Sequence, residues 1–185
     1  GGAGTTSTMS VQSLPNFPNQ ACIGPLSTQV NSTNGTLTIN STSTGGLHFN
    51  LSDPTVATGD TVCLDMTVTG FMDITAFQHA ISWNNTQLQY AGLRNFNTAA
   101  GFSSANFNVV GSTVRIIWDD PTALGVDLPD GTRLVSICFV ALAPNGSTAN
   151  VTMGATPGFP VDVTGVSGNI NATYDTGIVT IQAGG

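Results

Sequence analysis

The chain has 185 residues, 40% of them hydrophobic, which suits one large domain or one domain with an arm. Only 7% are charged, lysine is absent, and the net charge is −7 with a pI near 4.1. This balance excludes nucleic-acid binding and binding to anionic membranes, since both need a basic patch. No run of 18 apolar residues occurs, so we expect no membrane insertion.

Surface polarity must therefore come from Ser, Thr, Asn and Gly, a composition typical of strands and turns. The three cysteines are Cys22, Cys63 and Cys138, and none belongs to a C-x-x-C pair, so no zinc site is predicted. An odd count allows one disulfide with one free thiol, or an intermolecular bond. The missing lysine, the polar composition and a disulfide together indicate an extracellular protein.

The first part of the chain differs from the rest, because residues 1–45 hold no charged side chain. We place a boundary at Gly45-Gly46, which separates an extended N-terminal arm, 1–45, from a β-domain, 46–185. Within the arm, "TLTIN" at 36–40 is predicted to be extended.

From residue 46 onwards the sequence is predicted to form short strands separated by turn residues. The clearest strand lies in 57–70, where Val62, Leu64 and Met66 share one face and alternate with polar neighbours. The other predicted strands are 47–53, 76–84, 88–96, two strands in 106–120 with a turn at Gly111-Ser112, 132–142, 149–156 and 177–183. The nearest helical candidate is the short stretch 97–105. About nine strands, each with an apolar face to cover, predict an all-β sandwich of jelly-roll or Ig-like type.

Four stretches carry a family resemblance by their order and spacing. They are "GDTV" at 59–62, "ISWNNTQLQY" at 81–90, "DGTRL" at 130–134 and "GIVTI" at 177–181. Over about residues 46–183 the chain resembles the cohesin family of bacterial extracellular modules. The resemblance implies a nine-stranded jelly-roll sandwich. Cohesins that bind dockerin modules do so through one exposed sheet face and flanking loops, but no feature of this sequence marks such a face. The family's frequent Asp after the "ISW" strand is Asn84 here.

The resemblance also bears on the cysteines. In the cohesin topology the strands corresponding to 61–68 and 133–142 are antiparallel neighbours in one sheet. Alternation then places Cys63 and Cys138 on the same outer face, which implies a disulfide between them and an unpaired Cys22. The alternative is three reduced, packed cysteines.

No catalytic constellation stands out. The two histidines, His48 and His79, both lie in predicted strands, and His79 shares the apolar side with Phe77 and Ile81. A core or interface histidine is therefore the preferred interpretation over a catalytic one. No G-x-S-x-G, P-loop or H-E-x-x-H motif is present. We expect no enzymatic activity and no cofactor.

An acidic loop region lies between residues 119 and 130. Calcium prefers several oxygen ligands from such loops, but the spacing matches no EF-hand, and Asp-Pro and Asp-Gly are ordinary turn pairs. We interpret these acids as turn residues and expect no metal, with calcium as the alternative. They are Asp119, Asp120, Asp127 and Asp130.

Glycosylation is a further hypothesis, because attached sugar would solubilise a surface with so few charges. Asp60-Thr61-Val62 also resembles an O-glycan acceptor pattern of secreted bacterial proteins. Asn-x-Ser/Thr triplets arise by accident in a chain this rich in those residues, so unmodified asparagines are the alternative. The candidate sites are Asn34, Asn145, Asn150, Asn171 and Thr61.

The leader at 5–17 has period-two alternation, with Met9 and Val11 on one face and Leu14 and Phe17 following beside prolines. Such a segment suits β-strand addition to an exposed sheet edge. We hypothesise that these four residues contact a neighbouring copy, so that head-to-tail repetition builds a filament. The alternatives are an arm folded along its own domain and an inter-domain linker.

Together these features predict a structural protein of the bacterial cell surface, the adhesive subunit of a pilus-like homopolymer, with glycans as further partners. The alternative is a secreted binding module for a dockerin-like partner or for glycans. Glycan binding would need a row of exposed aromatic residues, but Trp83, Tyr90 and Trp118 lie in strands where they face the core.

Overall fold

The computed structural model describes residues 6–9, 20–23, 26–29, 35–38 and 46–183. The chain divides into two compact units, Gly1–Thr44 and Gly45–Gly185, and each has its own strand pairing.

The N-terminal unit contains two antiparallel strand pairs, one nested inside the other in sequence. β1 (Thr6–Met9) pairs with β4 (Gly35–Thr38), and β2 (Gln20–Ile23) pairs with β3 (Leu26–Gln29). The leader is extended at β1, but its backbone partner is β4 of the same chain, where Met9 lies opposite Gly35. The other three predicted contact residues, Val11, Leu14 and Phe17, lie outside the described residues.

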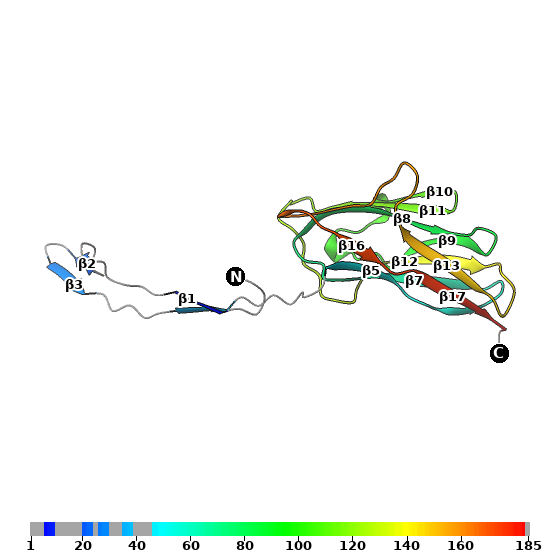
Figure 1. Ribbon diagram of the computed structural model, residues 1–185, viewed down its shortest axis with the longest axis horizontal. Helices are drawn as coiled ribbons and strands as arrows, with labels where there is room; N and C mark the ends of the chain where they lie inside the picture. Colours follow the sequence, from blue (N-terminus) through cyan, green and yellow to red (C-terminus); the bar gives the residue numbers. More distant parts are fainter. Residues whose placement is uncertain (1–5, 10–19, 24–25, 30–34, 39–45, 184–185) are drawn as a thin grey trace. The chain divides into compact units, whose positions relative to one another are not determined.

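The C-terminal unit is a sandwich of two sheets (Figure 1). The larger sheet has eight strands in the order β10-β11-β8-β13-β17-β6, with β14 pairing with both β8 and β15. Its strands are β6 (Thr55–Ala57), β8 (Ile74–Trp83), β10 (Phe107–Val110), β11 (Thr113–Asp119), β13 (Thr148–Gly154), β14 (Asp162–Gly165), β15 (Gly168–Asn169) and β17 (Gly177–Gln182).

The second sheet has five strands in the order β16-β5-β7-β12-β9. They are β5 (Leu47–Leu51), β7 (Thr61–Thr69), β9 (Leu88–Arg94), β12 (Thr132–Ala141) and β16 (Ala172–Tyr174). Most pairs are antiparallel, but β16 pairs with β5, and β17 with β6, in parallel. The all-β sandwich predicted from the sequence is confirmed.

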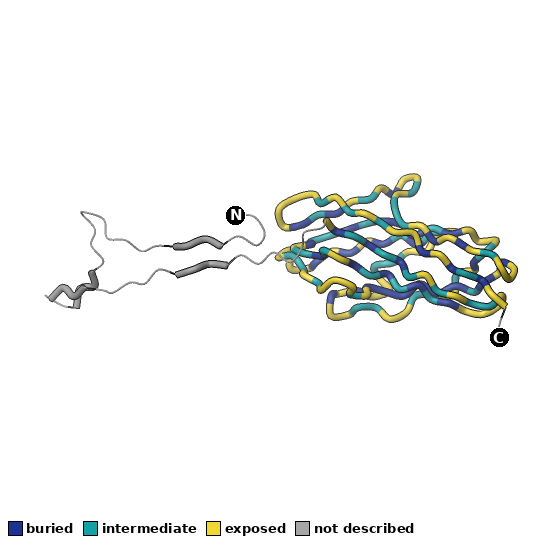
Figure 2. The backbone as a smooth tube through the Cα atoms, turned by 60° about the horizontal axis from the view of Figure 1, so that its bottom comes forward, coloured by how far each residue is buried: buried dark blue, intermediate teal, exposed yellow. Residues whose placement is uncertain are grey.

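The core lies between the two sheets because each strand buries every second side chain. Buried and more exposed residues alternate along the strands in Figure 2. In β7, Leu64 and Met66 are fully buried while their neighbours are partly exposed. An aromatic group that includes Phe77 and Trp118 fills one region, with ring centroids 5.5 Å apart. The Trp118 Nε1–H donates to the Ala100 carbonyl at 2.9 Å.

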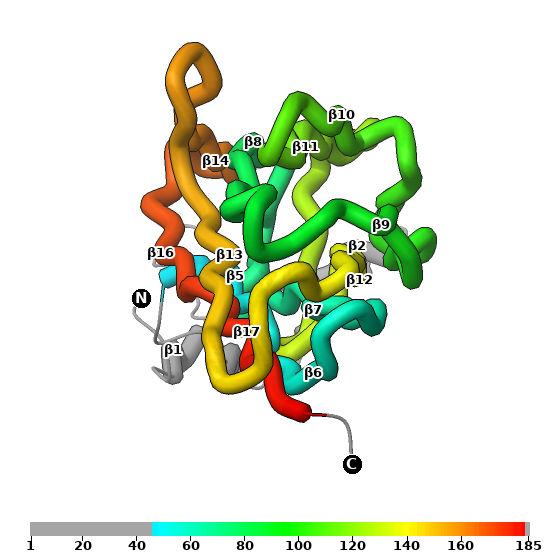
Figure 3. The backbone as a smooth tube through the Cα atoms, turned by 90° about the vertical axis from the view of Figure 1, so that its right-hand side faces the viewer, coloured from blue at the N-terminus to red at the C-terminus, as the bar shows by residue number. Residues whose placement is uncertain are grey.

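The helical candidate at 97–105 forms two short 3-10 turns, η1 (Thr98–Ala100) and η2 (Ser104–Asn106). Each strand predicted between residues 46 and 183 is present, and the turn at Gly111 joins β10 to β11 as expected. Four short strands, β6, β14, β15 and β16, were not predicted. The chain between β13 and β14 extends outward from the sandwich as the orange segment of Figure 3, at the face that β8 and β11 present to solvent.

Candidate functional site

The outer face of the eight-stranded sheet presents an apolar side chain at the middle of β11. Alternation along this strand buries Val114, Ile116 and Trp118, and turns Arg115 and Ile117 outward. Ile117 is 54% exposed, the highest value for a large hydrophobic residue on any strand between residues 46 and 183. An isoleucine exposed in a well-paired strand, between polar neighbours, is a candidate contact residue for another molecule.

A first hollow lies on one side of Ile117. Register places Ile117 opposite Gln78, and Gln78 opposite Asp162 of β14. Two residues further along β11, Asp119 lies opposite Ala76, whose small side chain lines the hollow together with these residues. The Gln78 Nε2–H donates to the Pro160 carbonyl at 2.9 Å, which ties the segment after β13 to this face. The hollow is therefore lined by apolar side chains and by the two carboxylates of Asp119 and Asp162.

A second hollow lies on the other side of Ile117, and its charge is opposite. Arg115 lies between Asn108 of β10 and Ala80 of β8 in the strand register. Its guanidinium carbon is 5.3 Å from the ring centroid of Phe159, a residue that is only 9% exposed. Reciprocal backbone hydrogen bonds of 2.9 Å between Thr156 and Phe159 hold the turn that carries the ring. Arg115, Asn108 and Phe159 all line this hollow.

The opposite sheet carries the disulfide. Cys63 of β7 and Cys138 of β12 are direct partners in the strand register, and an S–S bond of 2.02 Å joins them. This is the pair implied by the cohesin resemblance. Cys22 lies in β2.

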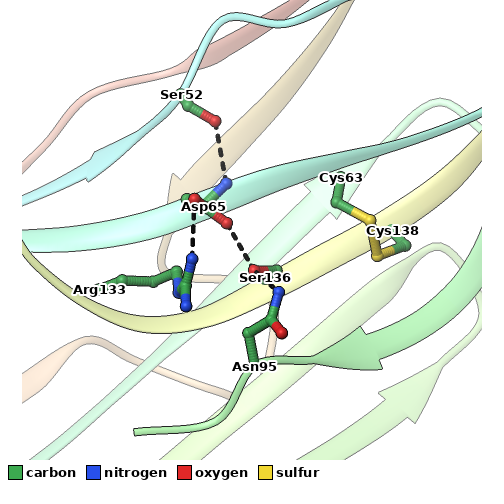
Figure 4. The surroundings of a disulfide bond; sticks show 7 residues. All are labelled: Ser52, Cys63, Asp65, Asn95, Arg133, Ser136 and Cys138. Atoms are coloured by element: carbon green, nitrogen blue, oxygen red, sulfur yellow. Dashed lines mark hydrogen bonds and ion pairs between the residues drawn. A yellow bond between two sulfur atoms is a disulfide. The ribbon is translucent and has the colours of Figure 1, made fainter.

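A polar network surrounds Asp65 next to the disulfide (Figure 4). The Asp65 carboxylate accepts a short hydrogen bond from the Ser136 hydroxyl and lies 3.5 Å from the Arg133 guanidinium. The Asn95 side-chain amide donates to the Ser136 hydroxyl at 3.1 Å, and the Asp65 amide donates to the Ser52 hydroxyl at 2.9 Å. These groups satisfy one another and tie β12 to β7 and to the segments around them.

The two histidines lie in different environments. His79 is fully buried, stacks on Phe77 with centroids 5.4 Å apart, and neither ring nitrogen has a hydrogen-bond partner. Burial lowers the pKa of His79 to about 3, so the ring is neutral near pH 7. His48 instead bonds Thr173 at 2.8 Å and Asp175 at 3.0 Å. His79 is thus a core histidine, as the sequence predicted.

The tyrosines respond to burial as well. Partial burial raises the pKa of Tyr174 to about 12, and the same cause raises the pKa of Tyr90. Tyr174 stacks on Phe49 with centroids 5.4 Å apart, and Tyr90 stacks on Trp83 at 5.8 Å. Both rings belong to the packing of the sandwich.

The acidic loop residues act as acceptors for backbone amides. Asp120 accepts from the amides of Thr122 and Gly125 at 3.0 Å, and the Thr122 amide holds the pKa of the Asp120 carboxyl below its usual value. The Asp127 carboxylate accepts from the Asp73 amide at 2.7 Å. Asp130 binds the amide of residue 70 in the same way at 2.8 Å. Across the described residues, no group of three or more His, Cys, Asp or Glu is arranged to hold a metal ion.

The candidate glycosylation residues are accessible where they are described. Asn145, Asn150, Asn171 and Thr61 are exposed, and the Asn145 side-chain carbonyl accepts from the Thr58 hydroxyl at 2.9 Å. Asn34 lies outside the described residues. Modification at these positions stays a prediction.

The outer face of the eight-stranded sheet was not predicted as a site from the sequence. The period-two pattern of 113–119 contained the necessary signal, because it puts Ile117 on the same side as Arg115 and Asp119. Phe159 could not be found in this way, since it belongs to a segment between strands and its partner is remote in sequence.

No protein-family model matches the sequence, and no curated protein matches it. Solved structures do match, and the described sandwich has the fold of the cohesin modules. A type I cohesin from Pseudobacteroides cellulosolvens superimposes with a TM-score of 0.63 at 13% identity, over 76% of this chain and 94% of that one. A non-cellulosomal cohesin from the archaeon Archaeoglobus fulgidus gives 0.58 at 11% identity, over 74% and 91%.

A third match is a type I cohesin–dockerin complex from Clostridium thermocellum, with a TM-score of 0.62 at 13% identity, over 74% of this chain and 99% of that one. In that structure a cohesin is paired with a different module. The expectation that this chain's partner is copies of itself is therefore wrong. The strand pairing gives a physical reason, because β1 already has a partner in β4. The pilus-like filament and its adhesive role have no support.

The described chain contains no helix with the length and apolar character needed to cross a membrane.

Proposed function

We propose that this chain is a secreted, non-enzymatic binding module, and that a dockerin-like protein docks on the outer face of β8 and β11. The proposal is supported by the fold, since cohesins of the same architecture have been solved in complex with dockerins. The observation that carries the choice of face is Ile117, an exposed apolar side chain in the middle of β11 with a hollow on each side.

The face has the anatomy of a protein–protein contact. Interfaces place a few desolvated apolar anchors at the centre and polar groups around them. Here Ile117 is central, Gln78 is adjacent, and the charged residues Arg115, Asp119 and Asp162 lie further out. Burying the exposed part of Ile117 under a partner would contribute to affinity, while the charged rim would select which partner fits.

Secretion is supported by the Cys63–Cys138 disulfide, because such bonds persist in oxidising compartments. A binding role is preferred over a catalytic one because His79 is buried in the core and His48 is hydrogen-bonded to Thr173 and Asp175. Glycan recognition is less well supported, since none of the aromatic residues between 46 and 183 is exposed. We assign binding to the domain 46–185 and retain 1–45 as a separate arm.

The test uses the full chain on a biosensor against a panel of purified dockerin modules. We expect at least one to bind, and we expect Ile117→Asp to weaken that binding by roughly 2–4 kcal/mol, as loss of a central interface residue does. Leu142→Asp is the matched control, since Leu142 is 44% exposed but lies outside the face. If no dockerin binds, or if both variants bind like the wild type, the proposal is wrong.

A further inference from the structure

Arg115 is an unusual cation in an acidic protein. The chain has three arginines and ten acidic residues, yet Arg115 forms no ion pair and no side-chain hydrogen bond with any residue of 46–183. Arg133, by contrast, reaches Asp65. The Arg115 Nε is buried and has no hydrogen-bond partner. A buried donor without an acceptor costs stability, and no group between residues 46 and 183 accepts a hydrogen bond from this nitrogen.

Phe159 holds the guanidinium without consuming its donors. The guanidinium carbon lies over the ring, 5.3 Å from its centroid, a cation–π arrangement that uses no lone-pair acceptor. The N–H groups of a guanidinium lie in its plane and point outward from its edge. Arg115 is therefore held by Phe159 while the N–H groups along its edge remain able to donate.

The hollow in front of this edge has both polar and apolar walls. Asn108, which is exposed and lies opposite Arg115, offers an amide that makes no hydrogen bond with any residue of 46–183. Phe107, Phe159 and Ile117 provide apolar surface around it. An occupant must combine a hydrogen-bond acceptor with a short aliphatic stem.

A carboxylate meets these requirements better than other anions. Its two oxygens match the paired donors of a guanidinium in one plane. The net charge of −7 opposes the approach of multivalent anions such as phosphates. The apolar walls suit the methylene groups of an acidic side chain.

We propose that Arg115, Phe159 and Asn108 form a receptor for one carboxylate side chain, an aspartate or glutamate of the protein that docks on this face. This inference rests on the proposed function and adds the chemistry of the partner. The carboxylate accepts from the guanidinium edge and from the Asn108 amide, and its stem packs against Ile117.

The strand also gives the partner a direction. Arg115 and Asp119 are four residues apart on β11 and both point outward, so about 13 Å separates them along the strand. Ile117 lies between them, and Asp162 adds to the negative end. A partner that follows β11 should present an acidic, an apolar and a basic residue in that order. If it docks as a helix, about nine residues span the distance.

Nuclear magnetic resonance can test the receptor directly, because the full chain contributes only three arginine Nε–H signals and no lysine. The probe is N-acetylglutamate amide, and N-acetylglutamine amide is its neutral control. We expect N-acetylglutamate amide to shift the Arg115 Nε–H signal and the Asn108 side-chain amide signal, and both shifts should saturate as its concentration rises. N-acetylglutamine amide should shift neither signal. Equal shifts at Arg94, Arg115 and Arg133 would show nonspecific ion pairing and overturn the receptor.

Variants then separate this inference from the proposed function. With a dockerin that binds the wild type, Arg115→Gln should weaken binding roughly tenfold, as loss of a charge-assisted hydrogen bond does. Arg94→Gln, in the opposite sheet, should leave it unchanged. Phe159→Leu keeps the cation but removes the ring, and should weaken binding too. If Ile117→Asp abolishes binding while Arg115→Gln does not change it, the docking face stands and the carboxylate receptor is wrong.

Discussion

Cys63 of β7 lies directly opposite Cys138 of β12, and the bond between them links two positions separated by 75 residues. The strands β8, β9, β10 and β11 all lie between these positions in sequence. The disulfide therefore restrains the segment that contributes the candidate docking face, even though it lies in the opposite sheet.

Reduction of this disulfide should destabilise the sandwich. Closing a loop of 75 residues lowers the entropy of the unfolded chain, which corresponds to roughly 4 kcal/mol in the loop-entropy model. We expect the double variant Cys63→Ser/Cys138→Ser to unfold at a lower urea concentration than the wild type. Its free energy of unfolding should be lower by about 2–4 kcal/mol. Reductant should lower the urea midpoint of unfolding of the wild type but not that of the double variant.

Cys22→Ser provides the control, since it removes the third cysteine and should keep the response to reductant. An unreduced digest should yield a peptide that joins Cys63 to Cys138. Detection of Cys22 linked to either of them would contradict the assignment.

Gly177 occupies a position where the two sheets approach each other closely. A Cβ at this residue would lie 2.6 Å from Leu64 Cδ2 and 2.8 Å from Leu51 Cβ, both inside the core. Gly177→Ala should therefore cost about 1–3 kcal/mol in the free energy of unfolding, because a packed core cannot absorb the added methyl without moving. Chemical denaturation measures the loss. Gly46→Ala is the matched control, since its nearest neighbour would be Asn171 O at 3.7 Å. Equal stability of the two variants would refute the argument.

His79 makes stability depend on pH. Its pKa is about 3 in the folded protein against 6.5 for a free histidine, so below pH 6.5 only the unfolded chain takes up the proton. The free energy of unfolding should fall as the pH drops from 6.5 towards 3, by up to about 1.4 kcal/mol per pH unit from this residue alone. His79→Leu should remove that part of the slope.

The variant should also be at least as stable as the wild type at pH 7, because the two ring nitrogens it removes are buried without partners. Denaturation curves at several pH values measure both effects. His48→Gln serves as the comparison, and its curve should keep the slope due to His79. A wild type and a His79→Leu variant with parallel pH curves would show that the ring can be protonated within the fold.

The strands that could be predicted from the sequence are those long enough to show a period. β7 and β11 alternate apolar and polar side chains over seven or more residues, and their patterns identify both the strand and its buried face. β6 and β16 have three residues each, and β15 has two, so no period can be recognised. These strands form because neighbouring backbones offer hydrogen bonds, as when β16 joins β5 in parallel.

Part of the candidate site could be predicted from the sequence. Alternation alone exposes Arg115 and Ile117, but nothing local shows that they share a face with Asp162, which is brought there by the pairing of β14 with β8. Interpretation of the leader failed for a related reason. Its extended character was evident, but the sequence did not show that Thr36 and Leu37 would supply its partner strand.

Asp120 should stabilise the loop between β11 and β12 in a pH-dependent way. Its carboxylate accepts from the Thr122 amide and the Gly125 amide, and the first of these bonds is the main cause of its lowered pKa. Since the folded pKa lies below the unfolded value, this contribution is present at neutral pH and is lost as the pH falls through the folded pKa. Asp120→Asn should weaken the same bonds at neutral pH, and the difference from the wild type should disappear below the folded pKa.

Hydrogen exchange at the Gly125 amide reports on this loop directly. We expect faster exchange in Asp120→Asn at pH 6, because the neutral amide is a weaker acceptor than the carboxylate. Asp119→Asn is the neighbouring control and should leave the Gly125 rate unchanged, since that amide donates to Asp120. If both variants exchange at the wild-type rate, the loop is held by its packing against Val166 rather than by the carboxylate, because a Cβ on residue 125 would already lie 2.7 Å from that side chain.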